Sequence, residues 1–354
     1  MTRSRTSQVL RTRNLVALAA LVTGTATAQL GGSKVDFDAL PQQPYPAEMM
    51  ERADKDLALD VTWTGEHYIV TGDRGHVLVS RDGRDWAQVP VPVRAALTAV
   101  HFVDADHGWA VGHDAAILHT TDGGRTWETQ NFEPELEEPF HDVLFFDLER
   151  GVAIGAYGLA YVTSDGGQSW GELEAPELRG DEFHLNDIIR LDDGRLFVAG
   201  EYGLLAVADA PEGPWRRLQP PYGSSLFGAL PLDNGGVLVY GLRGNAFVAR
   251  DLTAVPDLDP DFDPVLGSDD GLDGEGWETV STGTTNSMFG GVRMPNGNFA
   301  LVGLNGQIVR LTPEAEPDNA WRTASESPLA SAQLGPDHDL ILVGESGIEH
   351  FDLP

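Results

Sequence analysis

The chain has 354 residues, a formal net charge of −32 at pH 7, 41 glycines, 22 prolines and no cysteine. A surface this negative repels nucleic-acid phosphates and anionic lipid heads, which excludes both as generic partners, and the absence of cysteine excludes disulfides and a lipoprotein attachment site. The length is ample for a large core, and the abundance of glycine and proline favours a β-structure with many turns.

Residues 1–28 have the three-part layout of a secretory signal peptide. Four arginines precede an apolar run from Leu15 to Val22, and Ala26-Thr27-Ala28 supplies small residues for cleavage. The apolar run is too short and too broken to span a bilayer as a permanent helix. We therefore expect cleavage after Ala28 and an exported protein that is periplasmic or secreted and does not itself span a membrane.

Residues 29–56 contain several prolines and read as an extended N-terminal arm, and repeats occupy residues 57–354. Tryptophan recurs at positions 86, 127, 170, 215, 277 and 321, and a Gly-x-x-Gly turn begins at positions 72, 155, 200, 241, 303 and 344. A variant without the second glycine begins at Gly112. The intervals are 40 to 45 residues apart from one of 62, where both markers shift together. An insert of about residues 252–274 therefore lies in the fifth repeat.

Each repeat contains a hairpin signal that is clearest at Thr120–Trp127, Thr-Thr-Asp-Gly-Gly-Arg-Thr-Trp, and at Thr163–Trp170. A short Asp side chain accepts hydrogen bonds from backbone N–H groups nearby, and the glycines tolerate positive φ, so this segment favours a tight turn between two strands. We interpret these boxes as structural: Asp122 and Asp165 cap the turns, while Trp127 and Trp170 bury their rings against a neighbouring sheet.

A period of 40 to 45 residues with four short strands per unit is typical of a β-propeller, and seven markers predict seven four-stranded antiparallel blades. The last repeat lacks its final Trp, so we expect a strand from residues 34–48 to complete the seventh blade and close the ring. With strands named a to d from the axis outward, the Gly-x-x-Gly turns join b to c. They share one face with the d–a links, and the Asp-boxes lie on the opposite face.

These repeats resemble the photosystem II stability/assembly factor family of propellers, which carry BNR or Asp-box repeats. The resemblance covers roughly residues 57–354 and is strongest where Gly108-Trp109-Ala110-Val111-Gly112 and Gly151–Gly155 precede the two clear boxes. It implies a seven-bladed, exported assembly factor without catalysis or cofactor. A patch of arginines is associated with function in photosynthetic members, and Arg74 and Arg243 are the candidates here. We expect a relative from a bacterium without photosynthesis.

Both repeat geometry and resemblance direct attention to the b–c turns and the d–a links. The turn tips on this rim are polar or aromatic and differ from blade to blade. Such a set suits a protein partner, because Tyr and Arg are favoured at binding hot spots, although exposed turns are polar in any case. The predicted partner-binding residues are Arg74, His113, Tyr157, Tyr202, Arg243, Asn305 and Glu345, together with His141 and His184 on the d–a links. The histidine pair could also contact a metal, but local hydrogen bonds suit it better, and no metal is assigned.

Two other functions stay open on the same face. A sialidase-like glycoside hydrolase would need converging arginines, a Tyr nucleophile with a Glu, and an Asp acid, for which Tyr157, Tyr202, Tyr240 and Glu201 are on or near suitable turns. A glycan-binding lectin would show repeated aromatic platforms. The alternating aspartates of the insert could hold calcium, although their spacing lacks EF-hand positions and favours a solvated acidic loop.

The sequence therefore predicts a non-catalytic, exported, monomeric propeller. Its b–c face would bind another protein, in a membrane or envelope complex that the factor stabilises or assembles.

Overall fold

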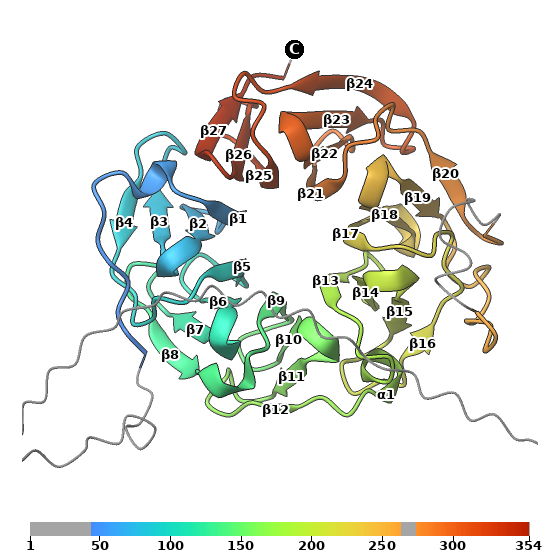
Figure 1. Ribbon diagram of the computed structural model, residues 1–354, viewed down its shortest axis with the longest axis horizontal. Coiled ribbons are helices and arrows are strands. Elements are labelled where there is room, and N and C mark those ends of the chain that lie inside the picture. Colours follow the sequence, from blue (N-terminus) through green and yellow to red (C-terminus); the bar gives the residue numbers. More distant parts are fainter. Residues whose placement is uncertain (1–43, 263–273, 354) are drawn as a thin grey trace, which may run out of the picture. The chain divides into compact units, whose positions relative to one another are not determined.

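Seven antiparallel sheets follow one another around an axis in the computed structural model (Figure 1), which describes residues 44–262 and 274–353. The described residues belong to one unit, Gln42–Pro354. The first four blades are β1 (Ala58–Trp63), β2 (Tyr68–Gly72), β3 (Val77–Ser80) and β4 (Ala87–Val89); β5 (Leu97–Phe102), β6 (Gly108–Gly112), β7 (Ile117–Thr120) and β8 (Glu128–Asn131); β9 (Phe140–Phe145), β10 (Gly151–Gly155), β11 (Ala160–Thr163) and β12 (Gly171–Glu172); β13 (Leu185–Arg190), β14 (Leu196–Gly200), β15 (Leu205–Ala208) and β16 (Arg216–Arg217).

The remaining three blades confirm the predicted seven-bladed propeller and its period. Consecutive inner strands contact each other around the ring, and β1 contacts the inner strand β25 of the last blade. The fifth to seventh blades are β17 (Leu226–Pro231), β18 (Val237–Gly241), β19 (Ala246–Ala249) and β20 (Glu278–Val280); β21 (Met288–Arg293), β22 (Phe299–Gly303), β23 (Gln307–Leu311) and β24 (Pro317–Arg322); β25 (Leu329–Leu334), β26 (Leu340–Gly344) and β27 (Gly347–Phe351).

The core lies between the blades. The second strand of each blade, β2 and its equivalents, is buried along its whole length, because a neighbouring blade covers each of its two faces. This is why these strands read as continuous apolar runs, as in Gly108–Gly112, and do not alternate. Hydrophobic clusters fill the interfaces between neighbouring blades, including the one between the seventh blade and the first.

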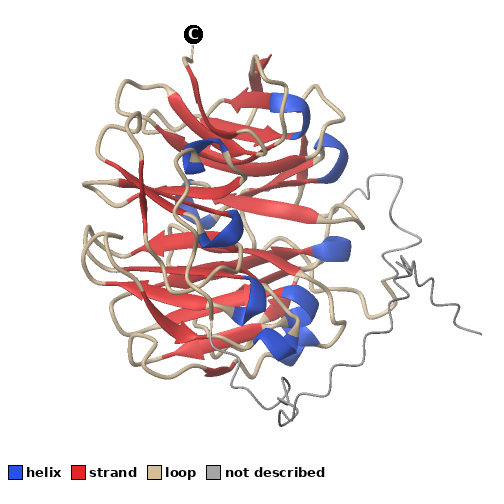
Figure 2. Ribbon diagram, turned by 60° about the vertical axis from the view of Figure 1, so that its left-hand side comes forward, coloured by secondary structure: helices blue, strands red, loops and turns tan. Residues whose placement is uncertain are grey.

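The glycine at the end of the second strand of each blade lets the d–a link that enters the same blade approach closely. A Cβ on Gly112 would collide with the carbonyl oxygen of Ala96, which belongs to the link that enters β5, and Gly155 has the same relation to Pro139. The backbone at Gly112 is extended, with φ of 177°, so glycine is required there by space. The repeated glycine thus seats each d–a link against the b–c turn of its own blade. Figure 2 shows the short helical turns at the ends of the strands.

The seventh blade has three strands within the described residues, and part of the predicted closing strand lies elsewhere. The Ala47 N–H donates to Val91 O at 3.1 Å, and the Gln88 side chain donates to Glu48 O at 2.9 Å. Residues 44–48 therefore run beside the outer edge of the first blade, and they do not pair with β27. Residues 34–43 lie outside the described residues, so a closing strand from that segment stays a prediction.

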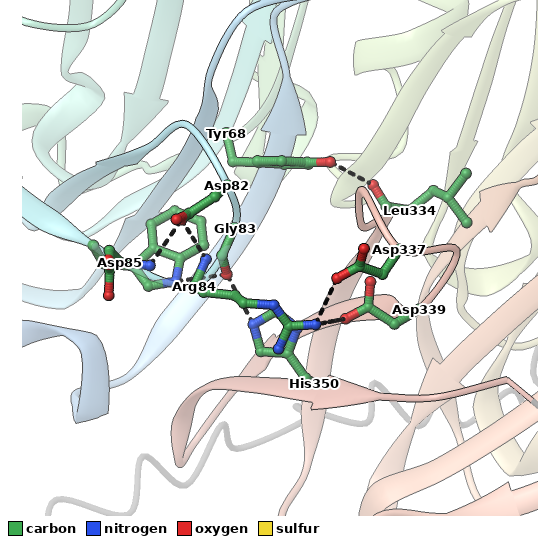
Figure 3. A network of polar contacts seen from close by, with 10 residues as sticks. Tyr68, Asp82, Gly83, Arg84, Asp85, Leu334, Asp337, Asp339 and His350 are labelled. Carbon is green, nitrogen blue, oxygen red and sulfur yellow. Dashed lines mark hydrogen bonds and ion pairs between the residues drawn. The ribbon is translucent and has the colours of Figure 1, made fainter.

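Side chains join the last blade to the first (Figure 3). Arg84, in the hairpin of the first blade that corresponds to an Asp-box, donates to Asp337 at 2.9 Å. His350 bridges Asp339 (2.7 Å) and the carbonyl oxygen of Gly83 (2.8 Å), and Asp339 is buried. On the other face, the short turn η2 (Ala53–Lys55) occupies the place of a d–a link against β27. The ring thus closes through this network and this link.

The insert of the fifth blade begins as a docked segment. Leu252 and Val255 are buried, Arg216 donates to Leu252 O at 2.7 Å, and Gln219 N donates to Pro256 O at 2.9 Å. Residues 252–258 lie along the outer edge of the fourth blade and bury Leu252 and Val255, whereas the described aspartates Asp257, Asp259 and Asp261 are exposed, as a solvated acidic loop requires. Asp263, Asp269, Asp270 and Asp273 lie outside the described residues, so calcium binding there stays untested.

Candidate functional site

The b–c turns share one backbone conformation that most residues avoid. The middle residue of each turn is left-handed, which costs L-residues other than glycine roughly 1–2 kcal/mol and is easier for Asn and Asp than for Tyr or Arg. The turns are η3 (Asp73–Gly75), η4 (His113–Ala115), η6 (Ala156–Gly158), η7 (Glu201–Gly203), η9 (Leu242–Gly244) and η10 (Leu304–Gly306), and their φ values are 54° at Arg74, 59° at Asp114, 53° at Tyr157, 52° at Tyr202, 57° at Arg243 and 58° at Asn305.

Two predicted residues lie outside these left-handed positions: His113 precedes Asp114, and Glu345 belongs to the β26–β27 turn, which is built differently. His113 opens its turn and Glu345 follows Gly344, and both are exposed. The residue that matches Tyr157 in the second blade is Asp114, which spacing from the preceding glycine could have identified. The structure therefore places His113 and Glu345 on the predicted face, beside the tips.

Four aromatic side chains form a strip across the third and fourth blades. The Tyr157 and His184 rings lie 4.6 Å apart between centroids, and the Phe183 and Tyr202 rings lie 4.9 Å apart. The two pairs are connected through the adjacent residues Phe183 and His184 of one link. Tyr157 is 55% exposed and Tyr202 is 46% exposed. We call this set, Tyr157, Phe183, His184 and Tyr202, the aromatic strip; Phe183 was not among the predicted residues.

Backbone contacts hold the strip in place. The Tyr157 N–H donates to Nδ1 of His184 at 2.9 Å, so the histidine stabilises the left-handed turn. The His184 N–H donates to the carboxylate of Glu201 at 3.2 Å, and the Glu201 N–H donates to the His184 carbonyl at 2.9 Å. The two turns and the link between them are thus one hydrogen-bonded unit, which positions both tyrosines.

His141 lies below the strip, at the channel. Its Nδ1 is 3.0 Å from the Leu185 carbonyl, and its ring lies 5.6 Å from that of His184. Burial lowers the pKa of His141, which keeps the ring neutral near pH 7. Among the described residues no group of three or more His, Asp or Glu side chains is placed to hold a metal ion. The geometry favours the structural role for this histidine pair.

The other predicted residues lie on different blades and have their own partners. Arg74 is 3.4 Å from Asp56 and 3.6 Å from Asp73. Asn305 donates to Asn286 at 2.9 Å. Arg243 borders a groove of about 640 Å³ that the hydroxyl-rich segment 279–285 lines. Arg74 lies in the b–c turn of the first blade and Arg243 in that of the fifth, so the two arginines belong to blades that are not neighbours.

The central channel contains carboxylates that the repeat pattern did not single out. It encloses about 300 Å³ and is lined by Asp60, Asp142 and Asp187, which occupy equivalent positions in β1, β9 and β13. The carboxylate of Asp60 accepts from Val100 N at 2.9 Å, and Asp142 accepts from Ile188 N at 2.8 Å. Each of these carboxylates therefore ties its blade to the next. The sequence signal that could have identified these carboxylates was an Asp at the same position of three inner strands.

Burial governs the protonation of these groups. It raises the pKa of Asp60 to about 6 and, with repulsion from Asp187, raises the pKa of Asp142 well above its usual range. Burial also raises the pKa of Asp187, whose side chain lies beside that of Asp142. Since both carboxylates accept backbone N–H groups, this arrangement serves blade joining.

The Asp-boxes lie on the opposite face and are occupied by local bonds. Oδ1 of Asp122 accepts from the backbone N–H groups of Arg125 (3.0 Å) and Thr126 (2.9 Å), and its Oδ2 accepts from the Thr126 hydroxyl (2.7 Å). Asp165 accepts in the same way from Ser169, whose hydroxyl and N–H lower the pKa of Asp165. Trp127 is 8% exposed and packs into the cluster between the first two blades. Trp170 is only partly buried, and its indole N–H faces Gln130 at 3.3 Å.

Comparisons with known proteins are consistent with this geometry. The family model described as "Photosynthesis system II assembly factor YCF48" matches residues 78–141. The photosystem II stability/assembly factor HCF136 of Cyanidioschyzon merolae is 41% identical over 70 residues, 18% of this chain and 16% of that protein. The photosystem II assembly protein Ycf48 of Thermosynechococcus vestitus is 40% identical over 47 residues, 13% of this chain and 14% of that protein.

Solved structures resemble the chain over most of its length at low identity. A structure titled "YCF48 bound to D1 peptide" has a TM-score of 0.61 and 17% identity, covering 88% of this chain and 100% of its own. The WD40 propeller domain of Doa1 has a TM-score of 0.64 and 12% identity, covering 88% and 97%. At such identities the structural likeness shows the fold alone.

The matched segments span only 12% to 18% of the curated relatives' own lengths. The relatives are named as photosystem II assembly factors. The matched family model, these relatives and the YCF48 structures together support a photosystem II assembly factor-like family for this chain.

Proposed function

We propose that the protein is a non-catalytic, exported propeller that binds another protein through its b–c face and assists assembly or stability of a membrane or envelope complex. The observation that carries the proposal is the aromatic strip. Tyr157 and Tyr202 present large rings to solvent from left-handed positions that disfavour tyrosine. Exposed, rigidly held tyrosines suit the centre of a protein interface.

The relatives support the same class of function. They are named as photosystem II assembly factors, and one solved relative is titled as bound to a D1 peptide. Two relatives from Prochlorococcus marinus are named lipoproteins, which favours export. This sequence has no cysteine to carry such an anchor, so the predicted signal peptide of residues 1–28 is the proposed route. No helix in the described part of the chain is long and apolar enough to cross a membrane.

The two alternatives have less support from the site. The carboxylates of Asp122 and Asp165 are occupied by turn bonds, and the hydroxyl of the buried Tyr240 points at the Gly228 backbone beside the channel. A hydrolase would need a nucleophile and acid that converge on one substrate. A lectin would need repeated platforms, but the aromatic strip spans only two blades.

A pull-down from envelope extract tests the proposal. The test variant replaces Tyr157, Tyr202 and Arg243 with glycine, which adopts the left-handed turn without strain. The control is His338→Gly, which is also left-handed (φ 64°) and exposed but lies in the β25–β26 turn on the Asp-box face. The proposal predicts a partner retained by wild type and control and lost by the triple variant. Equal recovery of the partner by all three proteins would refute binding through the b–c face. Recovery of the propeller itself solely from the cytoplasm would refute export.

A further inference from the structure

Four glutamates lie in or next to the segments that form the aromatic strip. The Ala156 N–H donates to Pro139 O at 3.0 Å, which places the preceding residues Glu137 and Glu138 beside the turn of Tyr157. Glu182 directly precedes Phe183 in the chain, and Glu201 opens the turn of Tyr202 and accepts from the His184 N–H. Within residues 44–262 and 274–353, none of these four glutamates forms an ion pair with Lys or Arg.

The nearby cations are already engaged. Arg179 donates to Glu172 at 2.8 Å, and Arg217 donates to Asp181 at 3.2 Å. Burial raises the pKa of Glu138, and the neighbouring Glu182 and Glu172 add to this by repulsion, while Arg179 opposes it. This region is therefore more negative than its own side chains can neutralise, on a chain that is acidic throughout.

We propose that the aromatic strip binds a basic segment of the partner protein, an extended stretch bearing Lys or Arg side chains. The inference rests on the proposed function and names the chemistry of the partner. Cations are attracted to the electron-rich faces of aromatic rings, and two exposed tyrosines provide such faces on adjacent turns. Glu137, Glu138, Glu182 and Glu201 would neutralise the flanking charges of the same segment.

Charge complementarity distinguishes this occupant from an acidic one. An acidic segment would meet four glutamates, and the arginines described nearby, Arg179 and Arg217, are already paired, so its approach would be repelled. A basic segment would relieve the existing repulsion between Glu138 and Glu182. Cation–π contacts also persist at exposed sites, which matches rings that are about half exposed. The expected interaction is weakened by salt, because the carboxylates lie near the surface.

The test measures binding of fluorescent peptides to the full-length chain by anisotropy. The probes are a peptide of alternating Arg and Ser and its counterpart of alternating Glu and Ser. The first variant is Tyr157→Gly with Tyr202→Gly, and the second is Glu138→Gln with Glu182→Gln. Matched controls on the Asp-box face are His338→Gly for the tyrosines and Glu149→Gln with Glu314→Gln for the charges.

Wild type and both controls are expected to prefer the basic peptide, and the double tyrosine variant should bind it roughly tenfold more weakly. The double glutamine variant should lose affinity as well, and it decides the question if the tyrosine variant does not fold. Equal losses in test and control variants, or no loss in either test variant, would overturn the proposal. Binding of the acidic peptide that depends on Tyr157 and Tyr202 would overturn the basic partner but leave the protein-binding face standing. Failure of both peptides, together with an unchanged pull-down, would overturn both proposals.

Discussion

Replacing Trp127 with alanine tests whether the repeated Asp-box is a structural fastener. The indole is 8% exposed, donates to Gly124 O at 2.9 Å and packs at 6.1 Å from Phe102, edge to face. Loss of a buried aromatic side chain typically costs about 3–5 kcal/mol, and the lost hydrogen bond belongs to that sum. Trp127→Ala should therefore lower the free energy of unfolding by roughly this amount.

Trp170 provides a matched comparison in the next blade. Its ring is only partly buried and its N–H bond to Gln130 is longer, so Trp170→Ala should cost clearly less than Trp127→Ala. Urea denaturation followed by tryptophan fluorescence and circular dichroism measures both. In the folded fraction, neither variant should change binding of the basic peptide. Equal and small losses of unfolding free energy in both variants, or weaker peptide binding by folded Trp127→Ala, would refute the structural role of the Asp-box.

Three further predictions concern the channel, the ring closure and the turns. Burial raises the pKa of Asp60 to about 6, so the folded state binds a proton more readily than the unfolded state, and stability should rise as the pH falls from 8 to 5, by roughly 1 kcal/mol for this group; Asp60→Asn should flatten the profile, and an unchanged slope would contradict this cause. His350→Ala would leave the buried Asp339 without its imidazole partner and should destabilise the protein by roughly 3 kcal/mol in thermal or urea melts, whereas a neutral effect would show that the closing network is dispensable. Tyr157→Gly should be more stable than Tyr157→Ala by about 1 kcal/mol, since alanine retains the left-handed strain; the reverse order would refute strain at this turn.

Repeat spacing was sufficient to predict the blades because its signals are local. The glycine at the end of β6 and the box from Thr120 to Trp127 each act within one hairpin or its neighbour. The face of the b–c turns follows from strand alternation alone. The left-handed tip was harder to locate, since the second blade has Ala115 in place of glycine, and His113 was chosen beside Asp114.

Contacts between repeats were beyond the reach of spacing. Asp60 accepts from Val100, 40 residues away, and nothing local to either residue indicates the bond. The same applies to Phe183, which gains significance only beside Tyr202. The arm was expected to lie on the last blade, but Ala47 pairs with the first, because an extended segment can add to several exposed edges.

The central claim is that the partner binds the b–c face and that the Asp-box face is structural. Because the sequence contains no cysteine, one introduced thiol can carry a photo-cross-linker without background. Both His113→Cys, on the b–c face beside the aromatic strip's blade, and Ser164→Cys, in the third-blade Asp-box, replace exposed residues. The account predicts a partner adduct from the thiol at position 113 and none from position 164. An adduct formed only from position 164 would contradict it.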